Sequence, residues 1–280
     1  LFSSLGMALM VSANDLITLY LAIELQSLPL YVLASFRRDN INSGEAGIKY
    51  FVLGALSSSL FLFGASLIYG FTGSVEFFEI SKVTSYSEVS AGLVVGIVFI
   101  LSGLIFKISG VPFHMWTPDV YEGAPAPVTG FLATVSKGAV FVALTRFFVE
   151  GQLYEYQSLM TALAAVAIAS MLIGNWLALR QENIKRLLAY SSIAHFGYLL
   201  VVLIALSYSG AEAGLIRESI TFYLAAYILT TLAAFAVVAS IAGEDERKNH
   251  IASFDGLFWR RPIQAFSLTV AMLSFAGIPL

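Results

Sequence analysis

The sequence predicts an all-α polytopic membrane protein, on three observations. Of its 280 residues, 58% are hydrophobic and only 12% are charged, whereas soluble domains carry about 25% charged residues. Several apolar runs reach the roughly 20 residues that a helix needs to cross the hydrocarbon core of a bilayer. No sustained alternation of apolar and polar residues occurs, which argues against a membrane β-barrel. A bundle of membrane-spanning helices accounts for all three.

The apolar runs give the expected helices in chain order. Seven windows are long enough to be complete spans, and a shorter run at each end of the chain is expected to be a partial span. The complete windows are 16–36, 46–71, 91–111, 126–148, 158–179, 187–207 and 219–242, and the partial ones are 1–12 and 264–280. No linker rich in Pro, Gly or Ser divides them, so we expect one transmembrane domain over residues 1–280.

The beginning of the chain has neither an initiating Met nor the basic stretch of a signal peptide. Together with the two partial spans, this predicts a fragment that is truncated at both ends.

The basic residues of the connecting loops predict how the chain is oriented. When successive loops are assigned to alternate sides, nine basic residues fall on one side and three on the other. The nine are Arg37, Arg38, Arg180, Lys185, Arg186, Arg247, Lys248, Arg260 and Arg261, and the three are Lys82, Arg146 and Arg217. Cytoplasmic loops carry the excess of Lys and Arg, so the first side is expected to be cytoplasmic. The other side also holds an acidic stretch with Glu76, Glu79 and Glu88.

Four charged residues remain inside the apolar windows: Lys49, Lys107, Lys137 and Glu24. Ionisable residues within membrane spans are costly and usually functional. Function is therefore expected to reside in these four residues.

A weak internal repeat suggests an architecture. Gly110-Val111-Pro112-Phe113 recurs as Gly277-Ile278-Pro279-Leu280, five spans later, and the Ser57–Ser59 region is echoed near Thr230-Thr231. Because five is odd, the two units are expected to have opposite orientations in the membrane, as in transporters with inverted repeats. The units extend over about 1–148 and 158–280.

Lys137 lies close to the middle of the 126–148 window, too deep to reach water easily. A lysine that loses water holds its proton less tightly and can exchange it near neutral pH. A proton-carrying role is the favoured interpretation, and a structural salt bridge is the alternative.

Lys107 stands just before Gly110 and Pro112, where the helix is expected to break. A break frees backbone carbonyls that must face protein or water, which favours function over a snorkelling lysine.

The remaining candidates have closer structural alternatives. Glu24 is the only deep acid and could pair with Lys107 or Lys137. Lys49 lies about one turn from the cytoplasmic face, so snorkelling competes equally with function. His195 could relay a proton near its ordinary pKa of about 6.5, but a hydrogen-bonded core histidine explains it equally well.

Several classes of function are excluded. The chain has no cysteine and only three histidines, so zinc, haem and iron–sulfur sites have no convincing ligand set. No glycine-rich dinucleotide or phosphate-binding motif occurs, and a net charge of −3 does not favour nucleic-acid binding. No redox centre is therefore expected in this chain.

Three stretches of the sequence resemble a known family. They are Glu24 to Leu33 (ELQSLPLYVL), Phe106 to Val128 (FKISGVPFH followed by MWTPDVYEGAPAPV) and Lys185 to His195 (KRLLAYSSIAH). They are similar to the subunit N family of proton-translocating NADH-quinone oxidoreductase, respiratory complex I, whose mitochondrial counterpart is subunit 2. The WTPDVYEGAPAP run is typical of the wider antiporter-like superfamily, and the stretch from Glu24 to Val32 points to subunit N within it.

The resemblance implies a fourteen-helix antiporter-like fold with inverted five-helix repeats and a proton relay. It makes Glu24 the acid of the fifth helix, paired with Lys107 of the broken seventh helix. Lys137 becomes the central lysine of the eighth helix. His195 becomes a polar relay residue of the tenth helix, and Lys49 matches the lysine of the sixth. The family's second broken helix carries an ionisable residue shortly after the position of Gly277, and this chain stops at Leu280.

The resemblance also implies an assembly. The chain would pump protons as a subunit of a translocase, with neighbouring antiporter-like subunits as partners in the bacterial cytoplasmic membrane or the mitochondrial inner membrane. NADH, FMN, iron–sulfur clusters and quinone would be bound by other subunits. The alternative functions are a subunit of a multisubunit cation/proton antiporter, and a structural membrane subunit with vestigial charges.

Overall fold

The computed structural model describes residues 1–86, 90–207, 213–243 and 246–278, and this part of the chain forms helices and no strand. The prediction of an all-α fold is confirmed. The α-helices are α1 (Phe2–Ser12), α2 (Leu16–Ala34), α3 (Ile41–Thr72), α4 (Phe77–Tyr86), α5 (Ala91–Lys107), α6 (Trp116–Gly123), α7 (Ala126–Phe131), α8 (Lys137–Glu150), α9 (Gln157–Ala178), α10 (Ile184–Ile204), α11 (Ala213–Ala242), α12 (Leu257–Arg260) and α13 (Pro262–Phe275). A π-helix, Leu132–Ser136, joins α7 directly to α8, and short 3-10 helices cover Leu153–Glu155, Ala205–Ser207, Glu246–Asn249 and Ile251–Phe254.

The predicted windows coincide with these helices, with one correction to their number. Six helical segments are long and apolar enough to cross a membrane within the described residues, rather than seven. The missing one is the 91–111 window, which forms α5 with only 17 residues because the helix stops at Lys107. The partial windows at the two ends of the chain form α1 and α13.

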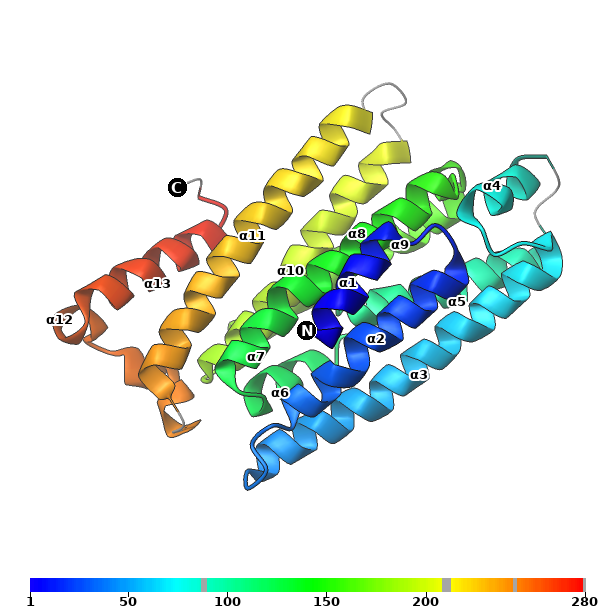
Figure 1. The fold of residues 1–280 in the computed structure, drawn as a ribbon. Helices are drawn as coiled ribbons and strands as arrows, with labels where there is room; N and C mark the ends of the chain where they lie inside the picture. The colour runs from blue at the N-terminus through cyan, green and yellow to red at the C-terminus, as the bar shows by residue number, and fades with distance from the viewer. Residues whose placement is uncertain (87–89, 208–212, 244–245, 279–280) are drawn as a thin grey trace.

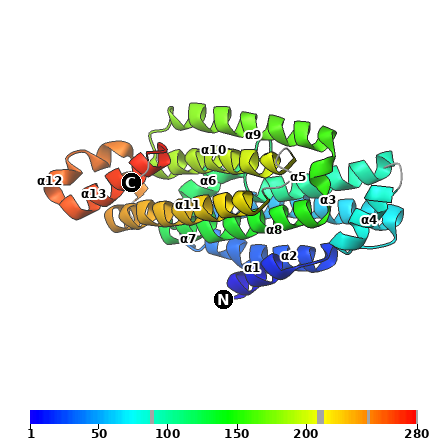
Figure 2. The ribbon, with the colours of Figure 1, turned by 90° about the horizontal axis from the view of Figure 1, so that it is seen from above.

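The long helices lie side by side with similar axes (Figure 1). In the view from above, α9 lies on one face of the bundle and α1 and α2 on the opposite face, with α8, α10 and α11 between them (Figure 2). The continuous segment Ala126–Glu150, which includes α7, the π-helix and α8, is the most enclosed, with 72% of its most apolar window buried against 33% to 61% in the other five spans. This segment is therefore the centre of the bundle.

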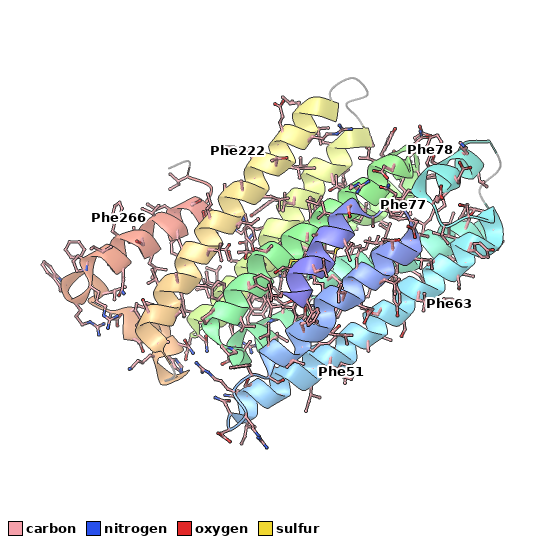
Figure 3. All side chains as sticks on the ribbon, in the orientation of Figure 1. Phe51, Phe63, Phe77, Phe78, Phe222 and Phe266 are labelled. Atoms are coloured by element: carbon pink, nitrogen blue, oxygen red, sulfur yellow. The ribbon has the colours of Figure 1, made fainter. Side chains whose placement is uncertain are left out.

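The outer surface of the bundle is apolar. Phe51 and Phe63 on α3 and Phe222 on α11 are 51%, 53% and 78% exposed, and their side chains stand on the outside of the bundle (Figure 3). Large exposed apolar surfaces mark contact with lipid or with other proteins. Helices satisfy their own backbone hydrogen bonds, so these faces can lie in lipid without cost to the backbone.

The loops gather at two opposite ends of the bundle, as the alternation of basic residues predicts. At one end, Arg37 donates to the Gly243 carbonyl over 3.0 Å, and the Ile251 amide donates to the Glu182 carbonyl over 2.8 Å. At the other end, Arg146 donates to the Val11 carbonyl. We call the first end, formed by residues 35–40, 179–183, 243 and 246–261, the basic end. Glu88, Pro279, Leu280 and the side chain of Arg247 lie outside the described residues.

Four of the long helices begin at a polar side chain that caps free backbone amides. Asp15 accepts from the amides of Ile17 and Thr18 over 2.9 and 2.8 Å at the start of α2. Asn40, Ser90 and Asn183 cap α3, α5 and α10 in the same way. Such caps each stabilise a helix by about 1 kcal/mol, and they set where the apolar windows begin to be helical.

Helices α3 and α5 approach closely at a pair of glycines. A Cβ atom on Gly64 would lie 2.6 Å from the carbonyl oxygen of Gly96, so only glycine fits there. Small residues at helix contacts let backbones approach in membrane proteins, where packing rather than hydrophobic transfer holds helices together. This contact keeps the broken helix α5 firmly against α3.

The predicted helix break after Lys107 is confirmed. Ser109 adopts a left-handed conformation with φ of 66°, and the amides of Ser109 and Gly110 donate back to the carbonyls of Phe106 and Ile105 over 3.0 and 2.9 Å. This is the Schellman pattern, which satisfies carbonyls at a helix end. The chain then turns through Pro112 into α6.

Helix α13 ends in the same pattern. Gly277 has φ of 81°, and the amides of Gly277 and Ile278 donate to the carbonyls of Ser274 and Leu273 over 3.0 and 3.1 Å. At the end of α13, the left-handed residue Gly277 stands two positions before Pro279 in the sequence. At the end of α5, the left-handed residue Ser109 stands three positions before Pro112. The two ends are therefore alike in hydrogen bonding and offset by one residue from the sequence match.

Candidate functional site

Two lysines are buried inside the apolar bundle, at the positions that the sequence predicts. Lys107 is 6% exposed at the end of α5, and Lys137 is 1% exposed at the start of α8. Neither forms an ion pair with a carboxylate among the described residues. An ammonium buried with neutral partners is expensive, so each position is expected to serve a purpose beyond packing.

The ammonium of Lys107 is held by two hydroxyls of α2. It donates to Ser27 Oγ over 2.8 Å and to the Tyr31 hydroxyl over 3.2 Å. The Trp116 indole donates to the Phe106 carbonyl over 3.0 Å, so the carbonyl next to the break is satisfied by protein. The break thus brings the last residue of α5 against a hydroxyl-bearing face of α2.

Glu24 lies one turn before Ser27 on α2 and is half-buried. Its carboxylate accepts a hydrogen bond from the Ser58 hydroxyl of α3. It forms no direct ion pair with Lys107 or Lys137 in the structure. The expected Glu24–Lys107 ion pair is therefore not formed, although Lys107 bonds to Ser27, one turn from Glu24 on α2. Ser27 and Tyr31 occupy the hydrogen-bond positions around the ammonium instead.

Lys137 follows the π-helix and faces α10. Its ammonium donates to Ser192 Oγ over 2.9 Å. Three aromatic rings surround the ammonium, with centroids 5.1 Å away for Tyr121, 5.5 Å for Phe196 and 5.7 Å for Trp116. Aromatic faces stabilise a cation at these distances, so the charged lysine is tolerated here without a carboxylate.

His195 lines a cavity of about 290 Å³ between α10, α11 and α13. Its Nδ1 lies 2.7 Å from the Tyr223 hydroxyl. Tyr227 lines the same cavity and donates to Ser192 Oγ over 2.8 Å. Lys137 is therefore connected through Ser192 and Tyr227 to the cavity that holds His195. The sequence indicated His195 but not the tyrosines, because tyrosines are common in membrane helices.

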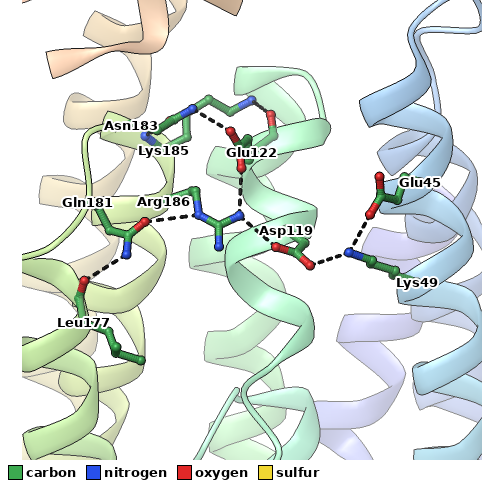
Figure 4. A network of polar contacts seen from close by, with 9 residues as sticks. All are labelled: Glu45, Lys49, Asp119, Glu122, Leu177, Gln181, Asn183, Lys185 and Arg186. Atoms are coloured by element: carbon green, nitrogen blue, oxygen red, sulfur yellow. Dashed lines mark hydrogen bonds and ion pairs between the residues drawn. The ribbon is translucent and has the colours of Figure 1, made fainter. Parts of the chain in front are cut away.

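Lys49 does not join this interior group. It lies towards the basic end, 40% exposed, with its ammonium 2.6 Å from carboxylate oxygens of both Glu45 and Asp119 (Figure 4). Its position towards the end of the bundle agrees with the expected one, and the structure adds two carboxylate partners. It belongs to an ion-pair network.

That network joins α3, α6 and α10 (Figure 4). Arg186 contacts Asp119 and Glu122, each over 2.8 Å. Asp119 lies on the short helix α6, outside the long apolar helices. Its burial acts to raise the pKa of this carboxyl, but the hydrogen-bonded Lys49 and Arg186 outweigh it and hold the pKa below its ordinary value. Asp119 therefore keeps its charge at neutral pH.

Lys185 has a role that its place in the sequence does not reveal. The sequence places it among the basic loop residues, but in the structure it is only 2% exposed. Its ammonium donates to the carbonyls of Glu122 and Ala124 over 2.5 and 2.6 Å, at the end of α6. A cation at a helix C-terminus satisfies free carbonyls and favours the helix dipole. Together with Arg186, Lys185 fixes α6, the helix that follows the break, to α10.

Metal or cofactor ligands do not gather anywhere in the described ranges. No group of three or more His, Asp or Glu side chains lies close enough to hold a metal ion there. What the interior offers is two lysines, a carboxylate, a histidine and a series of hydroxyls. Such groups can accept and release protons.

Comparison with known proteins agrees with this chemistry. The family model described as "NADH:quinone oxidoreductase/Mrp antiporter, TM" matches residues 13–280. NADH-quinone oxidoreductase subunit N of Methylobacterium nodulans is 49% identical over 280 residues, which are 99% of this chain and 56% of the relative. Subunit N 1 of Rhizobium meliloti is 50% identical over 281 residues, 99% of this chain and 57% of the relative. The chain thus spans little more than half the length of these relatives.

Solved structures share the fold. Respiratory complex I from Thermus thermophilus matches with a TM-score of 0.82 at 39% identity, over 99% of this chain and 58% of the other. An archaeal membrane-bound sulfane sulfur reductase matches with a TM-score of 0.86 at 28% identity, over 99% and 55%. The Mrp complex from Dietzia has a TM-score of 0.86 at 22% identity, over 99% and 51%, which indicates a common fold only.

These matches confirm the resemblance that the three sequence stretches indicated, and with it the antiporter-like fold. The chain belongs to the NADH:quinone oxidoreductase/Mrp antiporter transmembrane family.

Proposed function

We propose that this chain is a proton-translocating membrane subunit of NADH-quinone oxidoreductase. It moves protons through an intramembrane relay that is coupled to quinone reduction in other subunits. The observation that carries the proposal is the pair of buried lysines, each of which is bonded to hydroxyls and to no carboxylate of the residues that the structure describes. The relatives named as subunit N of this enzyme support the choice of enzyme.

The neutral partners of Lys107 and Lys137 favour a relay over a structural role. A lysine kept for stability in lipid is normally paired with an acid, because an unpaired buried charge is costly. A lysine among hydroxyls and aromatic rings can lose its proton without leaving a carboxylate unpaired. Both lysines can therefore alternate between charged and neutral forms while the bundle stays intact.

In the proposed path, protons enter from the basic end and pass from Lys107 to Lys137. They continue through Ser192 and Tyr227 to the cavity of His195. Glu24 regulates the first step, because a carboxylate near Lys107 stabilises its charged form and a carboxylate that moves away favours proton release. Moving one charge against 100 mV costs ~2.3 kcal/mol, which redox chemistry elsewhere in the complex supplies.

Lys49 takes a different place in the proposal. Its ion pairs with Glu45 and Asp119 hold the entrance at the basic end rather than the interior path. Lys49 thereby links α3 to α6, the segment that follows the broken helix.

The wider assembly follows from the same proposal. The chain forms one transmembrane domain of two inverted units, about 1–148 and 158–280, and the matching Schellman ends of α5 and α13 support the repeat. It spans little more than half the length of the relatives named as subunit N. Neighbouring antiporter-like subunits are its partners, and other subunits bind NADH, FMN, iron–sulfur clusters and quinone. The complex lies in the bacterial cytoplasmic membrane, or in the mitochondrial inner membrane if the chain is organellar.

The test is Lys137→Ala in the assembled complex, with Lys82→Ala as the matched control because Lys82 is an exposed lysine on α4. Proton uptake into inverted membrane vesicles is measured together with NADH oxidation and the amount of assembled complex. We expect Lys137→Ala to lose proton uptake at normal assembly, while Lys82→Ala behaves as the unchanged enzyme. Normal uptake with normal NADH oxidation in Lys137→Ala would refute the proposal.

A cation/proton antiporter subunit is the second candidate, because the family description includes Mrp antiporters. The stretch from Glu24 to Val32 and the subunit N relatives argue against it. The two differ in cation dependence: an antiporter exchanges protons for Na⁺ without NADH, and a complex I subunit requires NADH oxidation. A purely structural subunit would tolerate Glu24→Ala and Lys107→Ala with unchanged pumping.

A further inference from the structure

Gln26 on α2 is a buried polar residue that the relay described above does not use. It is 2% exposed, and its side chain points towards the π-helix before Lys137. Its amide nitrogen donates to Ser136 Oγ over 2.6 Å and lies 3.5 Å from the Ser136 carbonyl oxygen. Helix α2 and the π-helix are thus joined by a side-chain hydrogen bond inside the bundle.

The place of this hydrogen bond links the two lysines. Ser27, the residue after Gln26, accepts from the ammonium of Lys107 over 2.8 Å. Ser136, at the other end of the bond, is the residue before Lys137. Gln26 therefore stands between the segment that holds one ammonium and the segment that holds the other.

The remaining atom of the Gln26 side chain is an unused acceptor. The carbonyl oxygen, Oε1, is buried and has no hydrogen-bond partner among the described protein groups. Buried acceptors are rarely left unpaired, because the unmade bond costs free energy. A buried water that bonds to two or more polar groups is the usual partner in such a place.

The π-helix adds a second observation. Segments of this kind within α-helices are frequent at functional sites, since the wider turn displaces backbone groups from the regular pattern. Here the segment is Leu132–Ser136, and its last residue is the one that Gln26 binds. The irregular turn and the buried amide thus meet at the point where the path enters α8.

We propose that Gln26 is a positioning residue for proton transfer between Lys107 and Lys137, holding an internal water at Oε1 and orienting the Ser136 hydroxyl. The proposal rests on the proposed function of the chain. The Lys107 ammonium gives one proton to the chain of hydroxyl and water, and that chain gives another to the neutral Lys137 amine. One N–H bond breaks at Lys107 and one forms at Lys137, while Gln26 gains and loses nothing.

The first variant is Gln26→Leu, which keeps the volume and removes both hydrogen-bonding atoms. The matched control is Gln157→Leu, because Gln157 is exposed at the start of α9. In inverted membrane vesicles with equal amounts of assembled complex, we expect proton uptake of Gln26→Leu to fall about fivefold, the factor that one net hydrogen bond is worth. The control keeps its rate.

A second variant separates positioning from packing. Ser136→Ala removes the other half of the same hydrogen bond and should slow proton uptake similarly. In the double variant the two losses should not multiply, because residues that act through one bond are not additive. Replacing H₂O by D₂O should slow Gln26→Leu more than the unchanged complex, since proton transfer has become the slow step. A packing role predicts the same isotope effect in Gln26→Leu as in the unchanged complex.

Three results would overturn the proposal: normal uptake in Gln26→Leu, fully multiplicative losses in the double variant, or an unchanged isotope effect. Should Gln26→Leu fail to assemble, Ser136→Ala and its isotope effect decide. Lys137→Ala in the same assay distinguishes the two proposals. If it pumps normally, the proposed function fails, and if it alone stops pumping while Gln26→Leu is normal, only the role of Gln26 fails.

Discussion

The ammonium of Lys137 and the hydroxyl of Ser192 lie 2.9 Å apart, and both residues are buried in the bundle. Ser192 also accepts from the Tyr227 hydroxyl over 2.8 Å, so its oxygen receives two donors. One serine thus serves both the lysine and the tyrosine that borders the His195 cavity. The central lysine and the cavity therefore share a hydrogen-bond partner on α10.

Ser192→Ala should slow proton uptake at least about tenfold, because hydrogen bonds to a charged group are worth about 1.5–3 kcal/mol. The substitution leaves Lys137 among aromatic rings and disconnects it from Tyr227. Proton uptake in vesicles is the measurement, normalised to assembled complex. Ser66→Ala is the control, since that exposed serine bonds only to a carbonyl of its own helix. Equal rates for the two variants would contradict the path through α10.

Lys107→Arg should abolish pumping although it keeps the positive charge. An arginine stays protonated in proteins and cannot release a proton to the next group. A lysine that served only as a fixed charge would be replaced by arginine with little loss. Vesicle proton uptake distinguishes the two roles, with Lys82→Arg as the control at an exposed lysine. Retained pumping in Lys107→Arg would assign Lys107 to structure.

Asp119→Asn should destabilise the purified complex by about 1 kcal/mol, a modest value because the carboxylate and its partners are partly exposed. The pKa of Asp119 is lower in the folded protein than its ordinary 3.8. The stabilisation is thus complete above that ordinary pKa and is lost only as the pH falls through the folded value. The difference in thermal unfolding between the variants should be constant from about pH 8 to about pH 5. Asp255→Asn, at an exposed loop position, is the control.

Gly64→Ala should weaken the bundle, whereas Gly70→Ala on the same helix should not. A Cβ at Gly64 would lie 2.6 Å from the Gly96 carbonyl, and a Cβ at Gly70 would meet nothing within 4 Å. Overpacking of this kind costs about 1–3 kcal/mol, while alanine at an open helical site is slightly stabilising. Thermal unfolding of both variants tests this, and equal stability would contradict the close contact of α3 and α5.

The fold could be predicted largely because membrane helices are long and their composition is uniform. Windows such as 16–36 and 158–179 follow directly from the length needed to cross a bilayer. The break after Lys107 could be predicted from Gly110 and Pro112, which interrupt a helix for local reasons. The π-helix before Lys137 could not, because Leu-Ala-Thr-Val-Ser contains no residue that demands it.

The candidate residues could be identified from the sequence because charges are rare in the interior of the bundle. Their hydrogen-bond partners could not be identified in this way. Ser27, Ser192 and Tyr227 are ordinary residues of membrane helices, and only their distances to the lysines distinguish them. The ion pair of Lys49 with Asp119 could not be predicted either, because Asp119 is 70 positions away in the sequence. Contacts between helices that are far apart in the sequence depend on how the helices pack, and a single sequence does not determine this packing in an obvious way.

The wide turn Leu132–Ser136 has a consequence for insertions and deletions. Each residue of a helix rotates the following side chains by about 100°. The turn takes up one residue more than a regular helix of the same span, so inserting a further residue would rotate Lys137 away from Ser192, with no change in the lysine itself. Length should therefore be conserved more strictly than amino-acid type in the first four residues of this segment: apolar substitutions at 132–135 would be tolerated, and a single-residue insertion would stop proton transfer through Lys137.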